Sequence, residues 1–262
     1  MKITEIQRFC MHDGPGIRSV VFFSGCPLRC KWCHNPETQS FSQQVYFDIN
    51  KCILCGACAF CKSSAHSFND NRHVYNRELC LKCGWCAEVC PSNALLNVQK
   101  EVCVEAVLEE VLRDKAFYGK EGGITLSGGE PMAQPEDALL LLKMAKSAGI
   151  TTAVETCGYF DEKYVPELCK YADWLLWDYK DSNWQRHKEN TGVSPEKIMN
   201  NLFLADKQGA KIILRCILID DVNNNPDHLN EVEKLKKSLK NCVLVDFIPF
   251  HSMGQAKARW LQ

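Results

Sequence analysis

The chain alternates short runs of apolar residues with longer segments in which apolar positions recur every three or four residues. Uninterrupted apolar runs of this length, bounded by polar residues, are typical of strands buried on both faces of a parallel sheet. The pattern predicts strands at residues 17–23, 124–127, 151–155, 174–179, 212–219 and 243–249.

Helical periodicity lies between several of these runs. Val107 and Val111 are four residues apart in one such segment, and Gly149 is suited to cap the C-terminus of another. Repeated strand, helix, strand order predicts an α/β fold with a parallel sheet, either open and doubly wound or a full or partial barrel, with function at the C-terminal strand ends. Helices are expected at 104–117 and 136–148, and two more begin with a capping residue and proline at 194–195 and 225–226.

Composition and charge narrow the range of partners. The 262 residues, 46% of them hydrophobic, are enough for the core of one or two domains. A net charge of -1 gives no basic surface for nucleic acid or anionic lipid. The first residues lack an apolar signal core, and no stretch approaches the ~18 apolar residues of a membrane span. We therefore expect a cytoplasmic protein without nucleic-acid or membrane partners.

The cysteine content changes this picture most. Seventeen cysteines in a reducing compartment are better explained as metal ligands than as disulfides, and they suggest a life without oxygen. Eight of them fall within 52–90, a stretch that has no long apolar period of its own. This distribution predicts a small domain at 47–97 inserted into a main domain made of 1–46 and 98–262.

Three cysteines near the N-terminus, Cys26, Cys30 and Cys33, have C-x3-C-x2-C spacing. Three thiolates would hold three irons of a four-iron cluster and leave the fourth iron open to a ligand that is not protein. An open metal position distinguishes a reactive site from a closed structural one. A zinc site is the alternative, but zinc sites usually repeat C-x2-C pairs, so the uneven spacing favours an iron-sulfur cluster.

A glycine pair, Gly128 and Gly129, follows the predicted strand at 124–127 and precedes Glu130. Paired glycines after a strand let the backbone approach a ligand closely, and the next helix offers free N–H groups. Taken alone, the pair indicates only a turn. Along the chain, the glycine pair follows the three-cysteine loop, the insertion and one crossover helix. Its combination with the three-cysteine loop favours a role in binding.

The insertion contains two cysteine runs. Cys80, Cys83, Cys86 and Cys90, followed by proline, reproduce the bacterial ferredoxin spacing, in which the fourth cysteine of each run serves the other cluster. Cys90 should therefore complete a cluster on the first run, and Cys61 one on the second. Because the gap before Cys61 is short, another donor such as His66 is an alternative, and two zinc sites are a further one. The first run consists of Cys52, Cys55, Cys58 and Cys61.

The sequence resembles a radical S-adenosylmethionine enzyme over essentially its whole length. The resemblance rests on the three-cysteine loop, the Gly128 turn and the alternation of strands and helices. Four further segments, 12–18, 33–38, 177–180 and 249–251, resemble the activating enzymes of glycyl radical enzymes. The resemblance implies a partial (β/α)6 barrel of the TIM type, here with an inserted two-cluster ferredoxin-like domain. It also implies three 4Fe-4S clusters, the two in the insertion relaying electrons to the first.

In such enzymes the open iron binds S-adenosylmethionine, which is cleaved reductively to methionine and a 5'-deoxyadenosyl radical. By the resemblance, Trp32 and His34 would lie near the adenine, and His251 would reach the ribose. Arg215, inside an apolar strand, needs an anionic partner, which the carboxylate of S-adenosylmethionine could supply. The methionine end would lie against the glycine turn and the strand end that contains Gly128, Gly129, Glu130, Asp178, Tyr179 and Lys180.

The resemblance also implies a cation site and a surface for a protein partner. Glu155, Thr156 and Asp178 would bind a monovalent cation, although Glu155 stands where relatives have a shorter aspartate. Asp13 would lie at the mouth of the site and contact the partner's glycine loop, acting with the three cysteines in catalysis. The expected partners are a glycyl radical enzyme as substrate and a flavodoxin or ferredoxin as reductant, with the chain itself a monomer.

Two other functions are compatible with these motifs. One is a radical S-adenosylmethionine enzyme that acts on a small molecule or a peptide with the help of auxiliary clusters. The other is a ferredoxin-like electron carrier, in which the clusters only transfer charge.

Overall fold

The computed structural model describes residues 1–261, and its largest element is an eight-stranded sheet in the order β12-β11-β10-β9-β8-β2-β1-β7. The six neighbours from β2 to β12 are parallel, while β1 and β7 run antiparallel beside β2. The strands of this sheet are β1 (Lys2–Cys10), β2 (Arg18–Phe23), β7 (Lys100–Glu101), β8 (Gly123–Gly128), β9 (Thr151–Thr156), β10 (Trp174–Asp178), β11 (Ile212–Leu218) and β12 (Cys242–Pro249).

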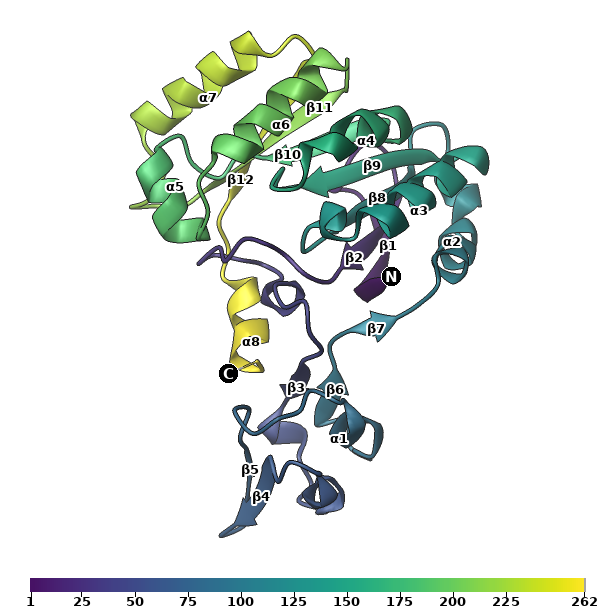
Figure 1. The fold of residues 1–262 in the computed structure, drawn as a ribbon, viewed down its shortest axis with the longest axis vertical. Coiled ribbons are helices and arrows are strands. Elements are labelled where there is room, and N and C mark those ends of the chain that lie inside the picture. Colours follow the sequence, from purple (N-terminus) through teal and green to yellow (C-terminus); the bar gives the residue numbers. More distant parts are fainter. Residues whose placement is uncertain (262) are drawn as a thin grey trace.

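Six parallel strands confirm the predicted partial barrel, because in the described chain the strand order ends at β12 on one side and at β7 on the other. All six predicted strands are present with ends that move by one residue or so. In Figure 1 the helices α3 and α4 lie beside β8 and β9, and α6 and α7 lie beside β11. The long helices are α2 (Val104–Leu112), α3 (Pro135–Ser147), α4 (Val165–Tyr171), α5 (Trp184–Thr191), α6 (Glu196–Lys207), α7 (Pro226–Ser238) and α8 (Met253–Arg259).

Alternate residues of the strands face two different environments. Ile124, Leu126 and Trp177 point to the helices and belong to one continuous apolar core. Their neighbours Thr125 and Asp178 belong to the opposite, concave face of the sheet. Helix α2 presents a buried apolar stripe to the same core, as its periodicity predicted, but it ends five residues early and a 3-10 turn follows. Among the described helices, none combines the length and the apolar character that crossing a membrane requires.

Arg18, at the start of β2, closes the N-terminal end of the concave face. Its side chain is fully buried, and its guanidinium donates to oxygens alone, none of them from a carboxylate. Burial lowers the pKa of Arg18 to about 10, so the group is charged near pH 7. The acceptors are Thr125 Oγ1, Pro15 O, Glu121 O, Thr151 Oγ1, Ile124 O and Thr151 O, at 2.6 to 3.2 Å.

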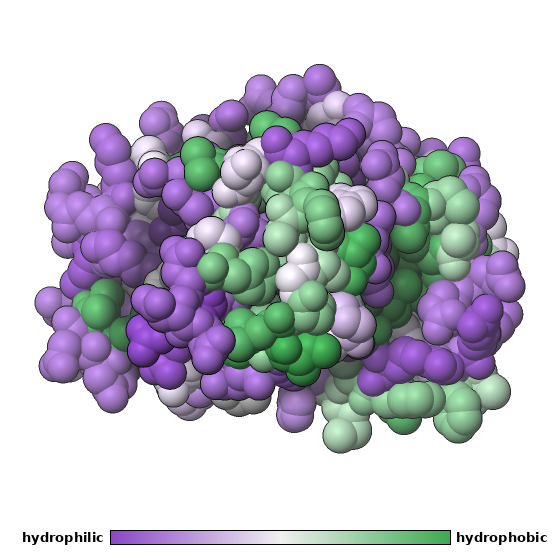
Figure 2. All heavy atoms as spheres, turned by 90° about the horizontal axis from the view of Figure 1, so that it is seen from below, coloured by the Kyte–Doolittle hydropathy of each residue, from purple (hydrophilic) through white to green (hydrophobic). Residues whose placement is uncertain are grey.

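The segment from β3 to β6 forms the part of the molecule farthest from the sheet helices in Figure 1. A small apolar cluster of its own contains Val45, Cys58, Cys86 and Leu95. Large apolar side chains are also exposed here, and Figure 2, which views the molecule from this end, shows hydrophobic residues gathered near the middle of the face. The segment contains β3 (Val45–Phe47), β4 (His66–Asn69), β5 (Arg72–Tyr75), α1 (Trp85–Glu88) and β6 (Leu95–Asn97), with β3 paired to β6 and β4 to β5.

The two cysteine runs of this segment have the same local backbone. Leu54 and Lys82, which are 28 positions apart, have φ angles of 56° and 57°. The glycines Gly56 and Gly84, two residues later in each run, have φ angles of 75° and 78°. Such left-handed conformations are rare for residues other than glycine, so their repetition at equivalent positions indicates two halves built on one plan.

Candidate active site

One pocket lies at the C-terminal ends of the parallel strands, where the fold places function. It is lined by the loop after β2 and by residues from the ends of β8, β9, β10, β11 and β12. The structure thus brings together most of the residues that the sequence predicted for the site. These are Cys26, Cys30, Trp32, Cys33, His34, Gly128, Gly129, Glu155, Asp178, Lys180 and Arg215.

The three-cysteine loop is fixed by backbone hydrogen bonds to parts of the chain far away in sequence. Arg29 N donates to Thr191 O at 2.7 Å, and Lys31 N donates to Asn190 O at 3.1 Å, so the end of α5 holds the loop on one side. On the other side Lys257 of α8 pairs with the buried carboxylate of Glu37. These contacts order the loop without using its sulfur atoms.

One compact group of candidate metal ligands lies in the insertion. Among the described residues, three or more candidate ligand atoms lie within 4.8 Å of one another at Cys58, His66 and His73. The sulfur atoms of the Cys26 loop are not gathered this closely around one point.

The electrostatics of the loop centre on Lys180, which is buried and pairs with Asp178 at 2.7 Å. Burial raises the pKa of the Cys30 thiol to about 12, and the Lys180 ammonium acts in the opposite direction. For Cys26, a hydrogen bond with the Cys157 thiol is the main cause of a lowered pKa. Buried thiols of this kind become thiolates when a metal centre compensates their charge.

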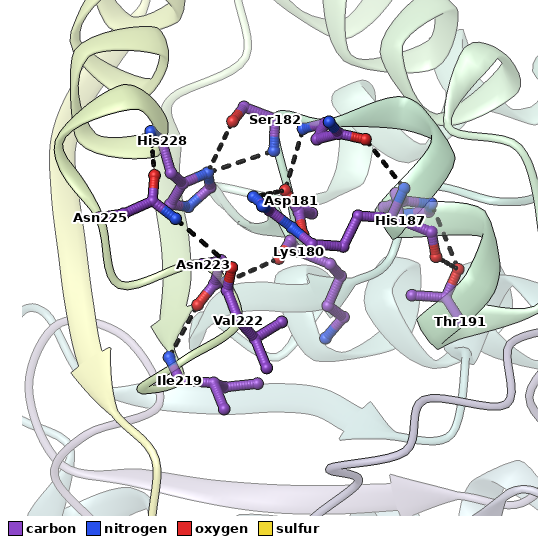
Figure 3. Close-up of polar contacts among 12 residues, drawn as sticks. Lys180, Asp181, Ser182, His187, Thr191, Ile219, Val222, Asn223, Asn225 and His228 are labelled. Carbon is purple, nitrogen blue, oxygen red and sulfur yellow. Dashed lines mark hydrogen bonds and ion pairs between the residues drawn. The ribbon is translucent and has the colours of Figure 1, made fainter.

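The loop that follows Lys180 is held by polar side chains that the sequence analysis did not single out (Figure 3). Asn223 donates to the carbonyl oxygens of Lys180 and Ile217 at 3.0 and 2.8 Å and accepts from Ile219 N at 2.7 Å. His228 of α7 bonds to Ser182, and Arg186 forms an ion pair with Asp181. Three consecutive asparagines before α7 were the signal in the sequence that could have revealed this support.

Arg215 lines the pocket and pairs with a carboxylate of the protein. Its Nη1 bonds to Glu155 Oε1 at 2.7 Å, and Ser127 donates to the other carboxylate oxygen of Glu155. The Glu155 carboxylate thus balances the charge of the Arg215 guanidinium. The two side chains meet on the concave face because their strands, β9 and β11, both flank β10.

The side chain of Glu130 supports the glycine turn from inside the protein. Its side chain is fully buried and accepts hydrogen bonds from Met132 N, Thr156 Oγ1 and Cys157 N at 2.8 to 3.0 Å. Its own N–H donates to Gly25 O, and the N–H of Gly129 to Phe23 O. Glu130 thus fixes the glycine turn from behind and does not line the pocket.

The glycines of that turn are required by close packing. A Cβ on Gly129 would lie 2.4 Å from Gly25 O, and one on Gly128, where φ is +97°, would lie 2.6 Å from Phe23 N. Only glycine lets the turn pack this closely against the start of the cysteine loop.

The three residues expected at the cation site have separate partners. Glu155 bonds to Arg215, Thr156 donates to Glu130, and Asp178 pairs with Lys180. A cation held by these residues stays a prediction, and binding it would require at least one of these contacts to change.

A second pocket adjoins the first and shares Cys30, Trp32, Cys33 and His34 with it. His251 lines this second pocket, and its ring stacks on His34 with centroids 3.9 Å apart. Trp32 Nε1 and His34 Nε2 are buried without a hydrogen-bond partner among the described residues. Buried polar atoms left unpaired in this way indicate a place where a bound molecule supplies the partner.

Two predicted residues lie elsewhere. Tyr179 belongs to the apolar core on the helix side of the sheet, and its ring stacks on His228 at 5.9 Å, because it follows Asp178 and points the opposite way. The loop that contains Asp13 enters the concave face from the N-terminal ends of β8 and β9, where Gly16 packs on Gly122. Asp13 O accepts a hydrogen bond from Thr125 Oγ1 at 2.6 Å, so Asp13 lies beneath the pocket residues Glu155 and Arg215 and does not line the pocket. Burial, with a contribution from Glu155, raises the pKa of Asp13.

In the insertion, Cys52, Cys55, Cys58 and Cys90 line one small cavity, the set predicted by exchange of the fourth cysteine. Burial raises the pKa of Cys86 to about 12, and charges on Cys80, Cys61, Cys58 and Cys83 act in the same direction, so the two sets lie close together. His66, the alternative donor for the second set, instead has its Nδ1 2.9 Å from His73 Nε2, beside Cys58.

Three comparisons with known proteins agree with this geometry. The Radical SAM superfamily matches residues 20–232. The choline trimethylamine-lyase activating enzyme of Oleidesulfovibrio alaskensis is 42% identical over 99% of this chain and 86% of its own length. The isethionate sulfite-lyase activating enzyme of the same organism is 37% identical over 98% of this chain and 85% of its own length.

Among solved structures, a radical SAM methyltransferase from Sphaerobacter thermophilus matches 89% of this chain and 56% of its own with a TM-score of 0.51 at 14% identity, a likeness of fold alone. With the pocket at the strand ends and two relatives matched over nearly the whole chain, the protein belongs to the radical SAM superfamily and, within it, to the activating enzymes of glycyl radical enzymes.

Proposed function

We propose that this chain generates a radical on a backbone glycine of a partner glycyl radical enzyme. The observation that carries the proposal is the single pocket in which three cysteines meet the polar ends of the parallel strands. A bound 4Fe-4S cluster and S-adenosylmethionine supply one-electron cleavage to methionine and a 5'-deoxyadenosyl radical, which takes the hydrogen. The residues of the chain hold, orient and shield these groups.

The proposed assignment of the pocket follows its chemistry. Cys26, Cys30 and Cys33 hold the cluster. The polar side with Asp178 and Lys180 suits the charged methionine end of S-adenosylmethionine. The adjoining pocket suits the adenosine, because the aromatic rings of Trp32, His34 and His251 offer stacking surfaces and unpaired ring nitrogens lie among them.

The insertion, residues 47–97, is proposed to hold two auxiliary 4Fe-4S clusters. One cluster would be held by Cys52, Cys55, Cys58 and Cys90, and the other by Cys61, Cys80, Cys83 and Cys86. A flavodoxin or ferredoxin would deliver electrons here, where apolar side chains such as Phe60 and Leu81 are exposed. Reduced thiols in this number fit a protein that works in the cytoplasm, where thiols stay reduced.

The decisive experiment mixes the reconstituted, reduced protein with S-adenosylmethionine and a candidate partner, first a choline trimethylamine-lyase, under anaerobic conditions. We expect 5'-deoxyadenosine together with a doublet organic radical in the electron paramagnetic resonance spectrum of the partner. An iron content of about 12 atoms per chain would support three clusters. A content of about 4 atoms would contradict the two auxiliary clusters.

Different failures of this experiment have different meanings. If 5'-deoxyadenosine forms but every candidate partner stays without a radical, an enzyme acting on a small molecule or peptide explains the site better. If iron is bound but no 5'-deoxyadenosine forms, the chain is an electron carrier.

Replacing Lys180 by methionine should weaken the binding of S-adenosylmethionine by roughly 10- to 100-fold. The reason is that a hydrogen-bonded charge contributes about 1.5–3 kcal/mol, and Asp178 would be left unpaired. The measurement is the concentration of S-adenosylmethionine that gives half-maximal formation of 5'-deoxyadenosine. Lys163→Met, at an exposed ion pair, is the control and should change nothing. Equal constants for Lys180→Met and the unaltered protein would disprove the assignment.

A further inference from the structure

The hairpin formed by β4 and β5 presents one face to both sets of cysteines in the insertion. His73 and Tyr75 are two residues apart on β5, so they share a face, and β4 places Phe68 and His66 opposite them. His66 stacks on Tyr75 with centroids 4.5 Å apart, and Phe68 stacks on His73 at the same distance. The four rings form one packed layer next to the cysteines.

His73 contacts the first set of cysteines through both ring nitrogens. Its Nδ1 is 3.4 Å from Cys52 Sγ, and its Nε2 is 3.6 Å from Cys58 Sγ and 2.9 Å from His66 Nδ1. The imidazole is buried and lines the same cavity as these cysteines.

The hydrogen-bond partners select the tautomers of the two imidazoles. A thiolate can only accept, so the imidazole of His73 serves the first set as a donor, from Nδ1 to Cys52 or from Nε2 to Cys58. The shorter contact, Nδ1 to Cys52, favours the proton on Nδ1, and Nε2 then accepts from His66 Nδ1. This arrangement puts one N–H donor on Cys52 and fixes the ring orientation through a second histidine, as outer-shell partners of metal ligands commonly do.

Tyr75 provides the equivalent contact for the second set. Its hydroxyl donates to Cys80 Sγ at 3.0 Å, a short distance for a bond to sulfur. Phe47 packs against the rings of both His73 and Tyr75 and holds them in place. One side of the hairpin therefore offers one donor to one cysteine of each set.

We propose that the β4–β5 hairpin sets the reduction potentials of the two auxiliary clusters independently, through His73 on Cys52 and Tyr75 on Cys80. Hydrogen bonds to the sulfur ligands tune cluster potentials, because they stabilise the more negative, reduced form. Each cluster takes up one electron, and no covalent bond forms or breaks. The inference rests on the proposed auxiliary clusters, and His73 and Tyr75 are positioning residues in it.

The test uses the full chain with Cys26, Cys30 and Cys33 replaced by alanine, so that only auxiliary clusters are titrated. The protein is reduced stepwise with dithionite, and both potentials are followed by electron paramagnetic resonance. Tyr75→Phe should lower the reduction potential of one cluster by about 59 mV and leave that of the other unchanged. This shift corresponds to a change of about tenfold in the equilibrium constant of a one-electron reduction. His73→Leu should lower the potential of the other cluster by a similar amount.

Two further variants separate the hydrogen bond from simple packing. His73→Asn keeps an N–H donor near the position of Nδ1 and should restore the potential that His73→Leu lowers. Tyr46→Phe, at a ring that packs on Trp260, is the control for loss of a hydroxyl and should move neither potential.

The possible results distinguish this inference from the proposal beneath it. If the protein with Cys26, Cys30 and Cys33 replaced by alanine binds almost no iron, the proposed auxiliary clusters do not exist. About eight irons per chain with potentials that neither Tyr75→Phe nor His73→Leu moves would overturn the inference alone, as would a shift of the same potential by both variants. If His73→Leu fails to bind iron, Tyr75→Phe decides, and two unmoved potentials then refute the proposal.

Discussion

Replacing Cys30 by alanine should abolish the formation of 5'-deoxyadenosine. Cys30 lines both adjoining pockets, and its loss leaves two thiolates where three are needed to hold the cluster. The decrease should exceed the ~100-fold that removal of an outer-shell partner costs, because a direct ligand is lost. Iron should fall by about one third, from ~12 to ~8 per chain, since the clusters of the insertion use other cysteines.

The matched control is Cys169→Ala. Cys169 lies on α4, partly buried against the apolar core and on the helix side of the sheet. This variant should keep its iron and its activity. A Cys30→Ala protein that still formed 5'-deoxyadenosine at a tenth of the normal rate or more would show that the three-cysteine loop is not the reactive centre.

Replacing Arg18 by methionine should cost about 3–5 kcal/mol of stability, since several buried carbonyl and hydroxyl oxygens lose their donors at once. Such a loss is a large part of the ~5–15 kcal/mol that a typical protein has. The urea midpoint of the cluster-loaded protein, followed by far-ultraviolet circular dichroism without oxygen, should decrease accordingly.

Arg113→Met provides the comparison for this variant. Arg113 is exposed on the surface beyond α2 and pairs with Glu109 and Glu110, contacts worth a few tenths of a kcal/mol. Its midpoint should stay close to that of the unaltered protein. If Arg18→Met and Arg113→Met unfolded at the same urea concentration, the Arg18 bonds would have no net effect on stability.

The parallel strands and helices α2, α3, α6 and α7 were predictable because local sequence patterns specify them. The run that became β2 has apolar residues on both faces, a signal that needs no knowledge of the rest of the chain. Strand β1 was missed because it lies near the edge of the sheet, where most of its residues are only half-buried or exposed. Helix α5 was missed because it is short and almost entirely polar.

Local sequence patterns do not predict contacts in the site between residues that are far apart in the sequence. The cysteine spacing identified the loop that lines the pocket, because its three cysteines lie close together in the sequence. The Arg215 partner could not be read, since Glu155 is 60 residues away and meets it only through strand order. The buried side chain of Glu130 could not be foreseen for a similar reason: its oxygens accept hydrogen bonds from the end of β9. The contacts of His73 and Tyr75 depend on the pairing of the β4–β5 hairpin.

The way the cysteine loop is held also has a consequence for biosynthesis. Residues 26–37 are made early, whereas the partners that hold them, Thr191 of α5 and Lys257 of α8, come much later in the chain. A Cβ on Gly254 would lie 2.6 Å from Cys33 O, so α8 packs directly on the loop. The loop therefore reaches its folded form only after α5 and α8 have been made.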